Sequence, residues 1–246
     1  MIRLIYDGTF EGLMTAIYEA FYIKEIPDTI CGIDELTPNL LATDITIETN
    51  LEKADKVCSA IKSKISRNAM EKVNYAYLSE LESAGMAIYG YLKLGFKVGS
   101  RVDCHLSHDA LLAIDKLVWK VKLERHRMLG FVRFKSVGDF FYSAIEPDHN
   151  ILSLISGHFK DRLINERFII HDLKRGIAFF NNRGDSVYAP LSKLEAQRFL
   201  KDNNDELYAE LWKEFFDTVA VEGRDNPKLQ KNYMPVRYWK HLTEMK

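Results

Sequence analysis

The opening stretch MIRLIYDGTFEGLMTAIYEAF (residues 1–21) decides the first part of the fold. Its first six residues, MIRLIY, predict a short buried strand that ends at Asp7 and Gly8. Thr9 is a suitable N-cap for a helix that starts directly afterwards. That helix carries an apolar stripe at helical spacing, which we expect to be buried: Phe10, Leu13, Met14, Ile17, Tyr18 and Phe21.

Short strands and amphipathic helices follow this stretch in an irregular order. Apolar patterning and turn residues predict further strands at 42–48, 130–135, 139–145, 167–171, 176–180 and 186–189. Helices are predicted at 50–65, twice within 68–98 with a break near Gly85 or Gly90, and at 108–127, 150–163, 192–201 and 205–220. Residues 28–42 are expected to be mostly loop, and the tail after 226 to form short helical pieces.

The order of these elements indicates the fold class. Because strands do not alternate regularly with helices, we expect an α+β fold, mostly helical with a small, largely antiparallel sheet. The length of 246 residues fits a single domain over 1–246, which can divide into sub-lobes at 1–100 and 101–246.

The composition excludes several classes of protein. An apolar fraction of 47% is enough for a core, and no run of 18 apolar residues predicts a membrane-spanning helix. The N-terminus lacks the pattern of a secretory signal. Cys31, Cys58 and Cys104 are odd in number and scattered, so neither a disulfide framework nor a CxxC zinc site is indicated. We therefore expect a reduced, cytoplasmic protein with no membrane partner.

The small net charge of -1 hides an asymmetry. Residues 1–100 carry more acidic than basic side chains, and residues 101–246 more basic than acidic. The positive excess lies in two clusters, residues 119–135 and residues 224–246. Clusters of this kind suggest an anionic partner, although solvated helix faces explain them equally well.

Several motifs with known chemistry are missing from the sequence. It contains no GxxxxGK[ST], no GxGxxG after a strand, no HExxH, no CxxxCxxC and no HxE…PCxxC. We therefore expect no cofactor. Cys104, His105 and His108 have a spacing that suits a shared metal, but no fourth ligand lies nearby. Capping and first-turn roles are favoured for them, and no metal is expected.

The segment ERHRMLGFVRFK (residues 124–135) is rich in the donors that bind phosphate. It also contains one histidine, His126. Alternatively, these side chains satisfy the last carbonyl groups of the preceding helix. The tail segment MPVRYWKHLTE (residues 234–244) interleaves aromatic and cationic residues that can stack on bases and hold phosphates, or can dock the tail on the main body.

Two groupings, HFKDR (158–162) and HDLKR (171–175), pair a histidine with an aspartate and an arginine. Such a pair can act as a general base with an orienting carboxylate. For the second grouping we favour a simpler interpretation, in which Asp172 opens a tight turn that Gly176 closes.

Two sets of candidate residues follow from these segments. The candidate catalytic residues are His126, His158, His171 and Asp172. The candidate nucleic-acid-binding residues are Lys122, Arg125, His126, Arg127, Arg133, Arg162, Arg175, Arg237, Tyr238, Trp239 and Lys240.

Segments spread over the whole chain resemble, in the same order, a bacterial family of proteins assigned to DNA metabolism or DNA repair. They are Tyr6–Phe21, His126–Phe134, Gly157–Arg162, the Asp172–Arg175–Gly176 spacing and NPKLQ…MPVRYWKHLTE (226–244). The resemblance implies a gene neighbour that encodes a radical-SAM protein of DNA repair or modification. Some members are fused to a uracil-DNA glycosylase-like domain. This sequence has no GQDPYH-like or HPS-like motif, so base excision is not implied.

Together these observations predict an accessory protein of DNA repair or DNA metabolism that binds DNA and a radical-SAM partner. Because CxxxCxxC is missing, any radical chemistry is expected to belong to that partner. One alternative is an enzyme that acts on a nucleotide or a nucleic-acid phosphodiester with His126, His158, or His171 and Asp172. Another alternative is a structural protein-interaction module. Salt-dependent DNA affinity and turnover that is lost with single histidine changes distinguish the three.

Overall fold

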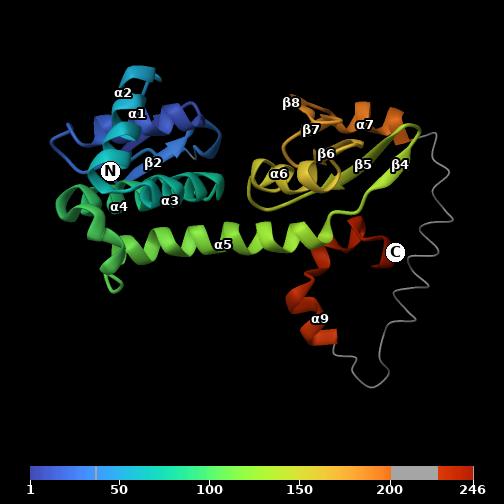
Figure 1. Ribbon diagram of the computed structural model, residues 1–246. Coiled ribbons are helices and arrows are strands. Elements are labelled where there is room, and N and C mark those ends of the chain that lie inside the picture. Colours follow the sequence, from blue (N-terminus) through green and yellow to red (C-terminus); the bar gives the residue numbers. More distant parts are fainter. Residues whose placement is uncertain (37, 201–226, 246) are drawn as a thin grey trace. The chain divides into compact units, whose positions relative to one another are not determined.

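The computed structural model describes residues 1–36, 38–200 and 227–245 (Figure 1). The chain divides into two compact units, unit 1 (Met1–Lys122) and unit 2 (Leu123–Lys246), which are described separately. The boundary between them falls within the helix α5 (Asp109–Phe131). The helix predicted at 205–220 lies outside the described residues, as do Arg224 and Lys246 of the basic tail cluster.

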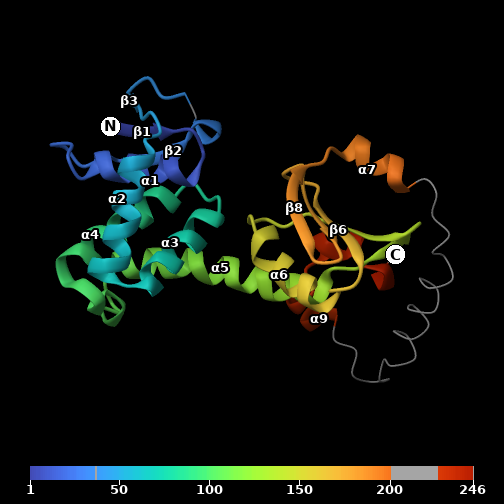
Figure 2. The ribbon, with the colours of Figure 1, turned by 45° about the horizontal axis from the view of Figure 1, so that its top comes forward.

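Unit 1 is built on a three-stranded parallel sheet with the strand order β2-β1-β3 (Figure 2). The strands are β1 (Ile2–Tyr6), β2 (Thr29–Gly32) and β3 (Thr43–Thr46). Strand β2 lies in the stretch 28–42, so the prediction of mostly loop was wrong there. Its four residues are too short for a visible alternation, and the turn formers around them hide a strand that is buried against β1.

Helix α1 (Phe10–Ala20) follows β1 and begins as predicted. The Thr9 hydroxyl accepts a hydrogen bond from the Gly12 backbone N–H at 2.9 Å. Leu13 and Ile17 of the predicted stripe are buried. Phe21 is 39% exposed, so that part of the prediction was wrong. The helix ends at Ala20, and Phe21 leaves the stripe to contact other aromatic rings.

The remaining helices of unit 1 follow in sequence. They are α2 (Leu51–Ala60), the π-helical turn η2 (Ile61–Ile65), α3 (Arg67–Leu78), α4 (Ala84–Val98) and the 3-10 turn η3 (Gly99–Cys104). The break predicted near Gly85 or Gly90 lies at 79–83, just before α4. Gly85 has another role: a Cβ atom there would lie 2.1 Å from the Ile30 carbonyl oxygen, so glycine lets α4 approach β2.

Unit 2 contains a five-stranded sheet with the order β4-β5-β6-β7-β8. The strands are β4 (Lys135–Val137), β5 (Phe140–Ile145), β6 (Arg167–Asp172), β7 (Ile177–Asn182) and β8 (Asp185–Pro190). Strands β5 and β6 are parallel, and helix α6 (Leu152–Arg162) forms the crossover between them. All other neighbours in this sheet are antiparallel. The fold is therefore α+β, but with two small sheets, of which the first is parallel and not antiparallel as predicted.

The strand predicted at 130–135 is also wrong at its start. Gly130 and Phe131 belong to the last turn of α5. The Val132 backbone N–H donates to the Met128 carbonyl at 3.1 Å, which extends the helical hydrogen bonding past the glycine. The first strand of unit 2 starts at Lys135 instead.

Helices cover both faces of the unit 2 sheet. On one face Phe168 contacts Phe179 and Phe134, and Phe134 reaches Phe159 of α6. On the other face α7 (Lys193–Leu200) closes a core with Tyr142, Ala178 and Leu191. The tail forms short helical pieces as predicted: α9 (Pro227–Tyr233), η4 (Val236–His241) and η5 (Thr243–Met245). Within the described ranges, no helix combines the length and apolarity needed to cross a membrane.

Candidate nucleic-acid interface

The predicted site residues of unit 2 gather around a buried carboxylate, Glu124, on α5. Glu124 is 3% exposed and accepts hydrogen bonds from the backbone N–H groups of Asp148 and His149, each at 2.8 Å. The Tyr238 hydroxyl of the tail donates a third bond to it. A buried carboxylate is costly unless it is paired with donors, so these bonds make Glu124 the point that joins α5, the loop after β5 and the tail.

The aromatic residues of the tail are used for packing. Tyr238 is 1% exposed, and its ring contacts Phe131 at the end of α5. Burial, together with the hydrogen bond to Glu124, raises the pKa of the Tyr238 phenol, which therefore remains a donor. The Trp239 indole N–H donates to the Met234 carbonyl at 2.9 Å. Tyr238 thus docks the tail on α5, as the second interpretation of the tail segment predicts.

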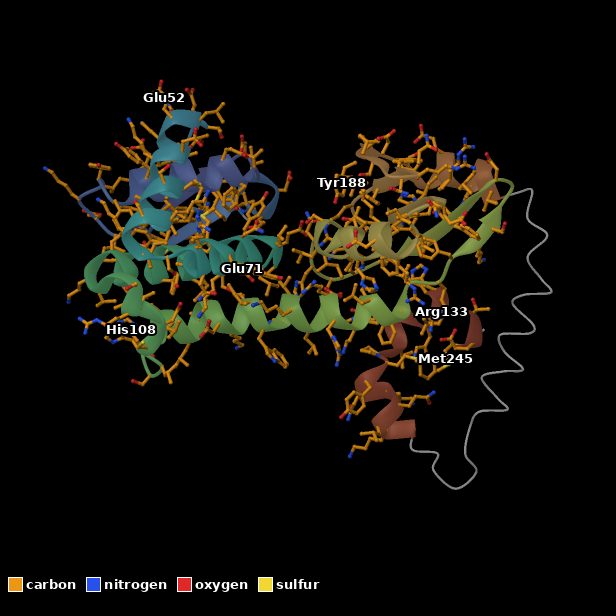
Figure 3. All side chains as sticks on the ribbon, viewed as in Figure 1. Glu52, Glu71, His108, Arg133, Tyr188 and Met245 are labelled. Carbon is orange, nitrogen blue, oxygen red and sulfur yellow. The ribbon has the colours of Figure 1, made fainter. Side chains whose placement is uncertain are left out.

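Three of the predicted cations form ion pairs beside this joint. Arg237 lies 2.8 Å from the Asp148 carboxylate and stacks on the Tyr238 ring. Lys240 pairs with Glu146. Arg133 pairs at 2.6 Å with Glu244, whose side chain is 1% exposed. Figure 3 labels Arg133 and, next to Glu244 in sequence, Met245.

Two further arginines of α5 bind backbone carbonyl groups. The Arg125 guanidinium donates to the Leu154 carbonyl at 3.2 Å, and Arg127 donates to the Asn232 carbonyl at 2.8 Å. The predicted cations of α5 and of the tail are thus brought together. Carboxylates compensate much of their charge, so the positive surface is smaller than the sequence predicts.

The basic surface that remains lies where α5 meets α9. We call it the α5–α9 surface: it comprises Arg127 at the contact and Lys228 and Lys231 on α9, with His126 next to Arg127 in sequence. His126 and both lysines are exposed, and among the described residues no carboxylate pairs with them. Lys228 lies one helical turn before Asn232, the residue that Arg127 contacts. The lysines were absent from the candidate set, although PKLQKNY contains no acidic residue.

The other candidate nucleic-acid-binding residues lie elsewhere. Arg162 is exposed at the end of α6. Arg175 pairs with Asp172 at 2.8 Å and also donates to the loop after β5. Lys122 belongs to unit 1, where it lies 3.6 Å from the Glu71 carboxylate and over the Tyr75 ring. The sequence places these three cations in one candidate set, but in the structure they belong to different elements and have different partners.

Two of the four candidate catalytic residues, His171 and Asp172, are fully buried on β6. Successive strand residues point to opposite faces, so the two side chains do not form a pair. His171 Nε2 lies 2.8 Å from the Leu191 carbonyl oxygen, and its Nδ1 lies 2.8 Å from the Tyr142 hydroxyl. Because a carbonyl accepts but cannot donate, Nε2 carries the proton and Nδ1 accepts from Tyr142.

Asp172 serves the turn that follows its strand. Its carboxylate accepts from the Lys174 and Arg175 backbone N–H groups, and Gly176 closes the turn with a φ of +63°. The turn interpretation is therefore confirmed. His171 and Asp172 are therefore not placed to act as a general base and its orienting carboxylate, because both side chains are buried and hydrogen-bonded. His126 and His158, which are exposed, remain for the enzyme alternative.

The segment of Cys104, His105 and His108 lies at the start of α5. His108 Nδ1 accepts a hydrogen bond from the Ala110 backbone N–H at 3.1 Å. Cys104 ends the 3-10 turn η3, and His105 follows it. This geometry is that of a helix start. Within the described part of the chain, no three His, Cys, Asp or Glu side chains gather in an arrangement that suits a metal ion.

A family model described as a domain of unknown function (DUF4130) matches residues 82–244. The chain belongs to the DUF4130 family. The matched residues contain α4 and α5 as well as every element of unit 2 from β4 to η4. Glu124 and the α5–α9 surface therefore lie inside the DUF4130 domain, and the parallel sheet of unit 1 precedes it. No match is found among curated proteins.

Proposed function

We propose that the protein is an accessory factor of DNA repair or DNA metabolism, which binds nucleic acid through unit 2 and acts together with a radical-SAM protein. The resemblance of five segments to a family assigned to these processes supports the proposal. The match to DUF4130 over 82–244 is compatible with it, because that domain contains four of the five segments.

The α5–α9 surface is the observation on which nucleic-acid binding rests. A phosphate backbone presents closely spaced charges, so clustered cations gain more from it than scattered ones. Arg127, Lys228 and Lys231 form such a cluster on two adjoining helices. Arg237 and Lys240 belong to η4 of the tail, and their side chains are 49% and 55% exposed. A guanidinium has five donors, so Arg237 keeps some of them after pairing with Asp148.

The second part of the proposal concerns the partner. The radical-SAM protein is expected to carry out the chemistry, because the catalytic candidates of this chain include two buried residues and its sequence lacks CxxxCxxC. The accessory factor would hold the nucleic acid while that partner acts. If the partner carries out the chemistry, this chain needs a basic surface for nucleic acid but no assembled histidine and aspartate pair.

The experiment is a measurement of DNA affinity by fluorescence anisotropy with labelled single-stranded and double-stranded oligonucleotides. The variant Lys228→Ala/Lys231→Ala should bind several-fold more weakly than the wild type. The matched control is Lys62→Ala/Lys64→Ala, which removes two exposed lysines from the π-helical turn of unit 1 and should bind as the wild type does. Equal affinity of both variants and the wild type would contradict the proposed interface.

The partner is tested separately by co-purification. The full chain should retain the radical-SAM protein that the resemblance implies is its gene neighbour when both are expressed together. Failure to co-purify, in the presence and in the absence of DNA, would contradict the partner role and leave the nucleic-acid role in place.

A further inference from the structure

The segment KLVWKVK (residues 116–122) of α5 presents a large aromatic side chain to solvent within unit 1. Trp119 is 63% exposed, whereas its neighbours Leu117, Val118 and Val121 are buried. In folded proteins tryptophan is highly buried on average, because its ring is large and mostly apolar. Among the described residues, no side chain stacks on Trp119 or hydrogen-bonds to it. A single exposed apolar residue is common, so its surroundings decide what it can bind.

Lysines flank Trp119 along the helix. Lys116 lies three positions before it and Lys122 three positions after it, and residues at this spacing are neighbours on a helix surface. Lys120 lies four positions after Lys116 and extends the same row. Lys116 is exposed and Lys120 is partly exposed, and within the described ranges neither of them forms an ion pair. The exposed ring therefore lies among cations.

Two carboxylates that adjoin this surface are already paired with lysines. Asp115, four positions before the tryptophan, lies 2.6 Å from the Lys72 ammonium group. The Glu71 carboxylate lies 3.6 Å from the Lys122 ammonium group. The two lysines without a carboxylate partner therefore leave positive charge beside the ring, which suits an anionic ligand that also has an apolar face.

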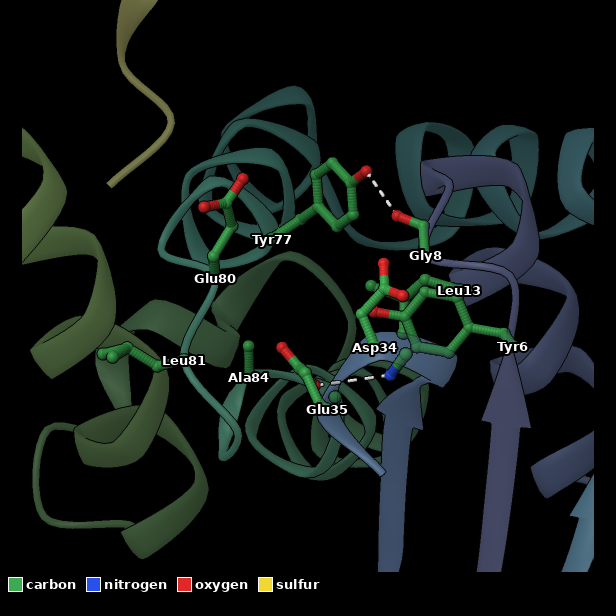
Figure 4. Close-up of a pocket in the computed structure, with 11 residues that line it drawn as sticks. Tyr6, Gly8, Leu13, Asp34, Glu35, Tyr77, Glu80, Leu81 and Ala84 are labelled. Carbon is green, nitrogen blue, oxygen red and sulfur yellow. Dashed lines mark hydrogen bonds between the residues drawn. The ribbon is translucent and has the colours of Figure 1, made fainter. Parts of the chain in front are cut away.

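A cavity of unit 1 suits such a ligand less well. It has a volume of about 320 Å³ at the carboxyl ends of β1 and β2, and Asp34, Glu35 and Glu80 belong to its lining (Figure 4). Among the described residues that line it there is no cation, and Glu35 accepts a hydrogen bond from the Gly32 backbone N–H. Because carboxylates repel phosphate, we expect an anionic ligand of unit 1 to bind on α5 and not in this cavity.

An aromatic side chain among cations is the arrangement that binds single-stranded nucleic acid, because bases stack on the ring while lysines hold the phosphates. In a duplex each base is already stacked and paired, and taking it out costs free energy. We propose that Trp119 stacks on an unpaired base of a single strand, and that Lys116 and Lys120 bind the adjoining phosphates. This inference rests on the proposed function and names its substrate class as single-stranded or locally unpaired nucleic acid.

The test is fluorescence anisotropy of the full chain with three labelled ligands: oligothymidylate, a strand of the same length made of abasic sites, and a blunt duplex. The wild type should bind the abasic strand about tenfold more weakly than oligothymidylate, because the abasic strand keeps the phosphates but has no base to stack. This comparison uses the wild type alone and does not depend on the folding of a variant.

Trp119→Ala should weaken the binding of oligothymidylate about tenfold and leave the affinity for the abasic strand and the duplex unchanged. Trp119→Phe should retain most of the affinity, since a phenyl ring still stacks on a base. Leu112→Ala is the matched control and should bind as the wild type does: Leu112 is 53% exposed, lies seven positions before Trp119 on the same face and has no ring. Lys116→Ala/Lys120→Ala should flatten the salt dependence of binding, whereas Trp119→Ala should not.

Three results would overturn the proposal: equal affinity of the wild type for oligothymidylate and the abasic strand, wild-type affinity of Trp119→Ala for oligothymidylate, or the same loss of affinity in Leu112→Ala. If Lys228→Ala/Lys231→Ala weakens DNA binding and Trp119→Ala does not, the stacking role is wrong and the α5–α9 surface stands. If the wild type binds none of the three ligands, the proposed function is wrong as well.

Discussion

The hydroxyl of Tyr238 donates a hydrogen bond to the carboxylate of Glu124, across 114 positions of sequence. Both side chains are buried. The bond fastens η4 to α5, and a separate hydrogen bond from Arg127 to the Asn232 carbonyl holds the end of α9 at the same helix. A contact hidden from solvent thus joins the tail to the same helix that carries Arg127 of the α5–α9 surface.

Tyr238→Phe should lower the free energy of unfolding by about 1–3 kcal/mol, because the Glu124 carboxylate loses a donor in a buried place. Urea denaturation of both proteins measures the difference. Tyr233→Phe is the matched control, since Tyr233 is 70% exposed and should tolerate the change. An equal decrease in the free energy of unfolding for the two variants would contradict a stabilising role of the buried bond.

Leu13→Ala should lower the free energy of unfolding by about 2–5 kcal/mol, the usual cost of a large-to-small change in a core. Leu13 is 1% exposed on the face of α1 that is buried in unit 1. Leu40→Ala, at a fully exposed position, should cost little. Thermal or urea denaturation checks both, and a Leu13→Ala protein as stable as the wild type would refute the assigned core.

The buried imidazole of His171 should make stability depend on pH. Burial lowers its pKa below the ordinary 6.5, although the Leu191 carbonyl and Asp172 oppose the shift. The unfolded chain then binds the proton more readily, so the free energy of unfolding falls as the pH drops through about 6.5 toward the folded-state pKa. His171→Gln should lose less stability between about pH 7 and pH 5 than the wild type. Urea titrations at several pH values measure this, and identical pH profiles would contradict it.

His108→Ala should remove a capping interaction and no metal site. We expect a decrease of about 1 kcal/mol in the free energy of unfolding, as for other N-cap changes. Metal analysis of the purified wild type should show no stoichiometric zinc or iron. Stoichiometric metal that disappears in His108→Ala would reverse this interpretation.

Local patterns predicted the elements that depend on local chemistry. Thr9 caps α1, Asn50 caps α2, and the turn between β6 and β7 forms around Asp172 and Gly176. Strand β2 was missed because its burial comes from pairing with β1, which lies far from it in sequence. The pattern predicts a strand that starts at Gly130, although helical hydrogen bonds continue past this residue. Pairing and helix length are set by tertiary contacts that single-segment patterns do not contain.

The sequence predicts which cations belong to the candidate site, but it does not predict the carboxylates with which they pair. The sequence locates the cations of α5 and of the tail, yet Arg133 and Glu244 are 111 positions apart, and no local pattern predicts their ion pair. His171 and Asp172 looked like a catalytic pair because they are adjacent, and adjacency on a strand separates them.

The central claim is that the α5–α9 surface binds phosphate. The most direct test is the slope of log Kobs against log salt concentration for DNA binding, between about 50 and 200 mM salt. The wild type should show a clear negative slope. Lys228→Ala/Lys231→Ala should flatten that slope by about one unit for each phosphate group that the variant no longer binds, with little dependence on the DNA sequence. An affinity that is independent of salt, or the same slope in both proteins, would contradict the claim.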